Sequence, residues 1–210
     1  MPQITTKALA EFLSRPITDQ MRILAEQKRP SGGAAAHKVH YYQSARAAVA
    51  RYFRHGNDVN RIQLAIARVQ ASNMAQHKIT HNIRAMNDFL QMTAFTGRIL
   101  VPFGSATVQH TLQNCDIRLF PDLSAAENNR NKFFLINFSQ FPVDPDYARR
   151  ALELSYWLHN SAGLGSRYGD FEFIDVTGQT IYRNNRRPRA TVVRNATQNI
   201  TVINQLWPIV

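Results

Sequence analysis

The sequence predicts an α/β (α+β) protein in which a helical region precedes a mixed-sheet core. Three observations favour this class. Apolar residues recur at helical spacing through the first hundred residues, short β-type runs begin at residue 98, and a continuous apolar run at 131–139 precedes an amphipathic stretch at 144–163. With 210 residues, 44% hydrophobic and 19% charged, the chain can bury one sizeable core or a helical lobe fused to a smaller α/β core. We therefore expect a basic helical region over residues 1–97 and an α/β core over residues 98–210.

The first two helices are expected on either side of Pro16. One covers residues 6–14 and ends at this proline, which can open a second helix over residues 17–27. Both have apolar residues spaced for one buried face. The proline and paired glycines of the next segment, 28–38, indicate a loop.

A third helix, expected over residues 41–56, has the clearest amphipathic pattern. Its apolar stripe consists of Ala45, Ala48, Val49, Tyr52 and Phe53. Arginines lie on the opposite side, and Gly56 supplies a stop. Asp58 can cap a fourth helix, and a fifth is expected at about 74–92.

The second half contains segments typical of strands. Three short runs lie at 98–104, 106–113 and 115–120, and the last two could form a hairpin. The run at 131–139 suits a strand buried on both faces. A helix follows over residues 144–163, then a hairpin at 170–183 that turns at Thr177–Gly178, and finally a β-branched stretch at 190–210.

The net charge of +11 is distributed unevenly. Residues 1–100 contain 14 Lys and Arg against 5 Asp and Glu, whereas residues 101–210 contain 11 against 9. This excess favours nucleic acid or another polyanion as a partner. A single cysteine excludes an internal disulfide and a cysteine-based zinc site. No stretch is apolar enough to span a bilayer and the first fifteen residues lack a signal core, so we expect a cytoplasmic protein without a membrane partner.

Two neighbouring strands carry residues typical of a metal-dependent nuclease. Asp122 lies in "RLFPDLS", and the next strand reads "KFFLINFSQFP". The helix "RRALELSYWL" and the hairpin "FEFIDVTGQTIYR" follow. On these residues, the segment 112–183 resembles the core of the restriction-endonuclease-like, or PD-(D/E)xK, superfamily, and its RecB-like branch in particular.

The resemblance implies a site in which two carboxylates bind Mg²⁺ and a lysine polarises the attacking water. Asp122 takes the first acid position, but Asn137 stands at the second acid position and Ser139 at the lysine position. The resemblance therefore implies a catalytically degenerate site without a metal or other cofactor. The alternative is an active nuclease with a relocated site, in which Asp116 supplies an acid, Arg149 or Arg150 supplies a cation, and Mg²⁺ is the cofactor. The family sometimes places an auxiliary acid in the first helix, where Glu11 lies.

Arginines on three segments are candidates for phosphate contacts, because the guanidinium fork forms paired, charge-assisted hydrogen bonds. They are Arg46, Arg51, Arg54, Arg61 and Arg68 on the helices, Arg149 and Arg150 on the helix of the core, and Arg183, Arg186, Arg187 and Arg189 in a basic segment.

We therefore expect a nuclease-like protein that binds nucleic acid, or that serves as a subunit of a nucleic-acid-handling system such as bacterial defence, which the resemblance alone implies. Two alternatives are the active nuclease and a protein-interaction module whose basic surface meets an acidic partner. The sequence does not predict the oligomeric state or the type of nucleic acid.

Overall fold

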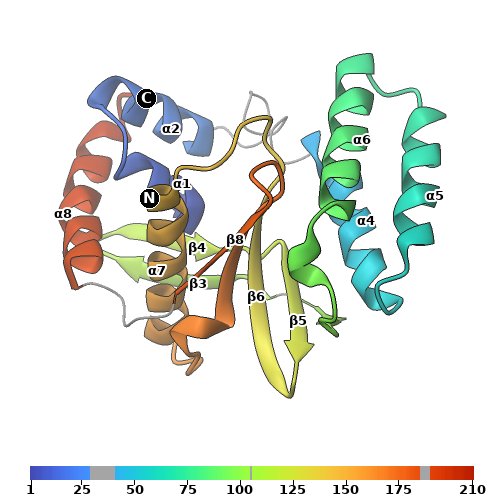
Figure 1. The fold of residues 1–210 in the computed structure, drawn as a ribbon. Helices are drawn as coiled ribbons and strands as arrows, with labels where there is room; N and C mark the ends of the chain where they lie inside the picture. The colour runs from blue at the N-terminus through green and yellow to red at the C-terminus, as the bar shows by residue number, and fades with distance from the viewer. Residues whose placement is uncertain (29–40, 105, 185–189) are drawn as a thin grey trace.

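The computed structural model describes residues 1–28, 41–104, 106–184 and 190–210. Within these ranges the chain forms seven α-helices, two 3-10 helices and two sheets (Figure 1). A helical region precedes a sheet core, which confirms the predicted α+β class.

The larger sheet has five strands in the order β2-β5-β6-β7-β8. Its strands are β2 (Val101–Phe103), β5 (Leu123–Glu127), β6 (Arg130–Asn137), β7 (Phe171–Asp175) and β8 (Thr180–Arg183). The neighbouring pairs are antiparallel except β6 and β7, which are parallel. A parallel pair needs a crossover, and helix α7 (Pro145–Ser161) provides it.

The central strands of this sheet are buried on both faces, as the apolar run at 131–139 predicted. Leu135 and Phe173 face one hydrophobic core, and Phe134, Ile136 and Ile174 face another. Each strand therefore alternates between two cores rather than between a core and solvent.

The smaller sheet has three strands in the order β1-β4-β3. They are β1 (Gln3–Thr5), β3 (Val108–Leu112) and β4 (Cys115–Leu119). β1 is parallel to β4, and β3 and β4 form an antiparallel hairpin. Gln113 and Asn114 make the turn with φ of 46° and 62°. Asparagine tolerates this left-handed conformation better than most residues, which suits a two-residue hairpin turn.

Four helices pack with the first core, on the left of Figure 1. They are α1 (Thr6–Phe12), α2 (Ile17–Lys28), α7 and α8 (Ala190–Leu206). The closing β-branched stretch thus forms a helix. Val192, Ala196, Ile200 and Ile203 recur at helical spacing and are all buried, and this burial outweighs the β propensity of the individual residues.

Three helices and a 3-10 turn cover the second core, on the right of Figure 1. They are α4 (Gln43–Arg54), α5 (Val59–Gln70), α6 (Gln76–Leu90) and η1 (Thr93–Phe95). The Asp58 side chain caps α5 by accepting a hydrogen bond from the Asn60 N–H at 3.0 Å, as the sequence predicted. The helices expected over residues 1–97 are therefore divided between the two cores on either side of the larger sheet.

Among the described residues, none of the helices combines the length and the apolar character that crossing a membrane requires.

Candidate functional site

Asp122 lies just before β5 and is held against β6. Its N–H donates to the Phe134 carbonyl at 2.8 Å, and its Oδ2 accepts from the Ile136 N–H at 2.7 Å. The side chain is only 6% exposed. The structure thus places the first predicted acid beside the strand that carries Asn137.

Two cations neutralise this carboxylate. Lys7 Nζ, from α1, lies 2.5 Å from Oδ2, and Arg46 Nε, from α4, lies 3.1 Å from Oδ1. The Arg46 contact is an ion pair without an aligned N–H hydrogen bond. Lys7 Nζ also donates to the Ile136 carbonyl at 3.1 Å. Because α1 and α4 belong to different cores, Asp122 joins the two helical layers at the end of the sheet.

Lys7 is half-buried, with 26% of its side chain exposed. Burial lowers the pKa of Lys7, and the Asp122 carboxylate raises it in part. A metal ion at Asp122 would have to displace two cations that already form ion pairs with the two carboxylate oxygens. Asp122 is therefore poorly suited to bind Mg²⁺ in this arrangement.

Asn137 and Ser139 contact each other at the end of β6. Asn137 Nδ2 donates to Ser139 Oγ at 2.8 Å, and Ser139 Oγ donates to the Phe141 carbonyl at 2.6 Å. Asn137 also stands opposite the buried Asp175 of β7, whose Oδ2 accepts from the Val143 N–H at 2.7 Å. The hydrogen bonds of this group hold the connection from β6 to α7.

Asp116 is not brought to Asp122. It lies at the start of β4, is 3% exposed, and accepts a hydrogen bond from Thr111 Oγ1 at 2.6 Å. Asp122 follows the other end of β4, where it pairs with Lys7 of α1, whereas Asp116 stands opposite Gln3 of β1. They do not form a shared metal site.

A cleft of about 320 Å³ opens beside Asn137 and Ser139. Its lining residues are Glu11, Ser14, Arg15, Asn137, Ser139, Phe141, Pro142, Val143, Asp144 and Tyr147. Burial raises the pKa of Tyr147, so this phenol stays protonated. Asp122 is absent from the lining, and among the described ranges no three His, Cys, Asp or Glu residues group as metal ligands would. The amide and hydroxyl at the motif positions do not suit Mg²⁺, which prefers charged oxygen ligands.

The candidate arginines of the helices fall into two groups. Arg51, Arg54 and Arg68 are exposed, and no acidic group of the described residues lies within ion-pair distance of them. We call these three the α4–α5 arginines. Arg61 is also exposed but pairs with Asp58 at 3.2 Å, and Arg46 turns inward to Asp122.

The other candidate arginines that the structure describes, Arg149, Arg150 and Arg183, contact polar groups of the same chain. Arg149 pairs with Asp146 at 2.9 Å, and Arg150 NH1 donates to Ser14 Oγ at 2.7 Å, which ties α7 to the end of α1. Arg183 lies 3.3 Å from the buried Glu172. Arg186, Arg187 and Arg189 lie outside the described residues.

Glu172 is the centre of an ion cluster that sequence reasoning missed. Arg98 bridges it to Glu127, with contacts of 2.8 and 2.7 Å, and Lys132 lies 3.6 Å away. Burial lowers the pKa of Arg98, but its hydrogen bonds to Glu127 and Glu172 outweigh this and raise the pKa above the ordinary value. The cluster links the segment between η1 and β2, which carries Arg98, to β5 and β7, and its groups are satisfied within the protein.

Sequence reasoning also missed Lys7 and Asp175. Lys7 is separated from Asp122 by 115 residues, and no local pattern signals their contact. Asp175 had a weak signal, since it is an acid at the end of the largely apolar run "FEFID", next to a turn.

A comparison with protein-family models, with curated proteins and with solved structures found no match to this chain.

Proposed function

We propose that this chain is a catalytically degenerate nuclease-like protein that binds nucleic acid without cleaving it. The observation that carries the binding function is the set of α4–α5 arginines, which are exposed and lack acidic partners among the described residues. On a chain with a net charge of +11, such groups are available to phosphate oxygens. A cytoplasmic location and a place in a nucleic-acid-handling system, such as bacterial defence, are part of this proposal.

The nuclease kinship is supported by topology. Asp122 precedes β5, β5 is antiparallel to β6, and α7 leads to β7, which is parallel to β6. This is the order of acid, strand, helix and strand that the resemblance implies. The loss of catalysis is supported by the ion pairs of Asp122 with Lys7 and Arg46 and by the neutral residues at positions 137 and 139.

The test is a titration of labelled duplex DNA, single-stranded DNA and RNA by fluorescence anisotropy, at salt concentrations from about 50 to 200 mM. We expect at least one of these ligands to bind and the affinity to fall steeply with salt. Replacing the three α4–α5 arginines by glutamine should reduce the slope of log K against log salt by roughly two to three, because about 0.7–0.9 is lost per phosphate contact.

A matched control removes the same charge elsewhere. Arg22, Arg118 and Arg194 lie on α2, β4 and α8, away from α4 and α5. Their triple glutamine variant should keep most of the affinity. If both triple variants lost the same affinity for nucleic acid, the net charge of the chain, and not these three arginines, would explain the binding. If no ligand bound at low salt, the proposal would be refuted.

A second candidate function, as a subunit of a protein complex, is favoured by the edge of the larger sheet. Val101 of the edge strand β2 is 62% exposed, and the neighbouring Ile99 and Phe103 are exposed as well. An apolar edge strand with free backbone groups can pair with another chain. A partner captured from the native host by the wild type but lost with Val101→Lys would support this function, whereas equal capture would exclude the edge as the contact.

A further inference from the structure

Two adjoining pockets lie at the opposite end of β6 from Asn137 and Ser139. One has a volume of about 320 Å³ and the other about 380 Å³. They are formed by the turn between β5 and β6, the end of α7, and the loop that leads to η2 (Tyr168–Asp170). Both are lined by Arg130, Ser166, Arg167 and Asp170, so these residues occupy the border between them.

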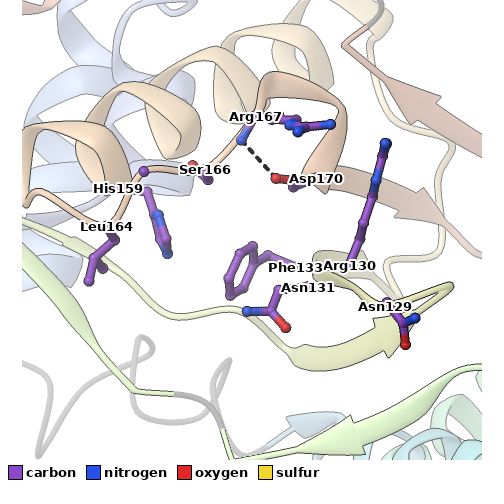
Figure 2. A pocket seen from close by; sticks show the side chains of 10 residues that line it. Asn129, Arg130, Asn131, Phe133, His159, Leu164, Ser166, Arg167 and Asp170 are labelled. Carbon is purple, nitrogen blue, oxygen red and sulfur yellow. Dashed lines mark hydrogen bonds between the residues drawn. The ribbon is translucent and has the colours of Figure 1, made fainter.

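The shared border is cationic. Arg130 and Arg167 are exposed, and no acidic side chain of the described residues lies within ion-pair distance of either. The one carboxylate of the border, Asp170, accepts a hydrogen bond from the Arg167 backbone N–H at 2.7 Å (Figure 2). Two guanidinium groups without a partner, at the mouth of a pocket, suit a phosphate group.

The ring of His159 lines the first pocket and is almost fully buried. His159 is 6% exposed, and its Nδ1 makes no hydrogen bond within the described part of the chain. Figure 2 shows its ring beside that of Phe133, and the ring centroids are 4.7 Å apart. Burial lowers the pKa of His159, so the ring is held neutral and keeps one donor nitrogen and one acceptor nitrogen.

Further polar groups line the same pocket. Ser166 Oγ accepts a hydrogen bond from Asn160 Nδ2 at 3.1 Å, which leaves its own O–H for a ligand. The amide of Asn131 also lines the pocket. Phe133 and Leu164 supply apolar surface, so the wall combines an aromatic platform with a few directional hydrogen-bonding groups.

The second pocket has an aromatic wall of its own. Tyr156 and Tyr168 pack edge to face with their ring centroids 5.7 Å apart. Aromatic side chains stack on nucleobases with little sequence preference. The cationic border therefore has an aromatic wall on each side, so a base can stack on either wall while its own phosphate lies at the border.

We propose that these pockets bind a nucleotide that carries a terminal phosphate, with the phosphate at Arg130 and Arg167 and the base against the Phe133–His159 wall. The chemistry is shared by a free nucleoside monophosphate and by the phosphorylated end of a nucleic-acid strand, whose terminal nucleotide would occupy the first pocket. This site goes beyond the proposed function, because it does not involve the α4–α5 arginines.

The test is calorimetric titration of the full chain with adenosine and uridine 5′-monophosphate, adenosine, inorganic phosphate, and one short oligonucleotide with either a 5′-phosphate or a 5′-hydroxyl end. We expect a monophosphate or the phosphorylated oligonucleotide to bind at least about tenfold more tightly than the ligand without the phosphate, a difference typical of one lost charge-assisted contact. Tighter binding of the oligonucleotide identifies a strand end, and tighter binding of the monophosphate identifies a free nucleotide.

Three variants test the assignment of residues. Arg130→Gln combined with Arg167→Gln should lose about tenfold or more in affinity, and His159→Phe, which keeps an aromatic ring, should weaken the nucleotide but not inorganic phosphate. The triple variant of the α4–α5 arginines should bind the mononucleotide as the wild type does, so failure of this site and failure of the proposed function are distinguishable. Circular dichroism verifies the fold of each variant.

Three results would overturn the proposal. The first is the absence of binding of every phosphorylated ligand to a correctly folded chain. The second is binding that the paired Arg130 and Arg167 variant leaves unchanged. The third is inorganic phosphate bound as tightly as the mononucleotide, which would remove the role of the aromatic wall.

Discussion

Lys7 and Asp122 are 115 residues apart in the chain, and their side chains form an ion pair of 2.5 Å at the end of the larger sheet. With Arg46 on the other oxygen, this contact joins the helices of one core to those of the other. The residue that resembles the first acid of a nuclease therefore has a structural role, and four predictions follow from this and from neighbouring features.

Removing the Asp122 carboxylate should destabilise the protein. Asp122→Asn leaves two cations facing a neutral group at a site where the acid is 6% exposed, and loss of one partner of a buried pair costs about 3–5 kcal/mol. Because Lys7 is 26% exposed, solvent screening reduces the expected loss to roughly 2–3 kcal/mol in the free energy of unfolding, measured by urea denaturation. Asp146→Asn breaks the exposed pair with Arg149 and should cost under about 0.5 kcal/mol. Similar losses in the two variants would contradict a junction role for Asp122.

The purified protein should not cleave DNA or RNA in the presence of Mg²⁺ or Mn²⁺. The reason is the donor set: Asp122 is neutralised, and Asn137 and Ser139 supply neither a second carboxylate nor a cation. A gel assay with labelled single and double strands measures this. Cleavage that disappears in Asp122→Asn, at a temperature where the variant is folded, would restore the active-nuclease alternative.

Stability should decrease in mild acid, in part through His159. Burial lowers the pKa of His159 below its ordinary value of 6.5, and the nearby Asp170 raises it in part. The folded state thus binds a proton more weakly than the unfolded state, so the stabilisation is present above pH 6.5 and is lost as the pH falls through the lowered pKa. The free energy of unfolding should fall less between about pH 7 and 5 in His159→Phe than in the wild type. The exposed His55 provides the control, and a His55→Gln variant with the same altered pH profile would argue against this assignment.

Cys115 should be unreactive in the folded protein. Burial, together with the neighbouring Asp116, raises the pKa of its thiol to about 11, and the side chain is 0% exposed. Since the thiolate is the reactive form, iodoacetamide at mildly alkaline pH should leave the native chain unmodified and should add one carbamidomethyl group after denaturation. Mass spectrometry distinguishes these states, and rapid modification of the native chain would show that β4 opens in solution.

Much of the fold was predictable from local patterns. The apolar run of β6, the helical spacing of α7 and the turn before β8 each lie within a short window, and the structure confirms all three elements. The tail from residue 190 was harder, because its β-branched residues favour a strand while the spacing of Val192, Ala196, Ile200 and Ile203 favours a helix. The segment forms a helix because this conformation buries all four of these side chains on one face.

The candidate sites were predictable only in part. Asn137 and Ser139 lie two residues apart, and their contact is local. The nucleotide pocket depends on Arg130, Arg167 and His159, which come from three separate segments and form no motif in the chain.

By itself, the sequence determined the α+β class, the basic character of the chain, and the neutral Asn137 and Ser139 at and just beyond the end of β6, because composition and periodicity act over short distances. Only the tertiary structure decided that Asp122 is neutralised by Lys7 and Arg46, and that Asp116 stands at the far end of its strand. The reason is physical: ion pairs and pockets form between side chains that packing brings together, and the packing of two cores on one sheet is a property of the whole chain.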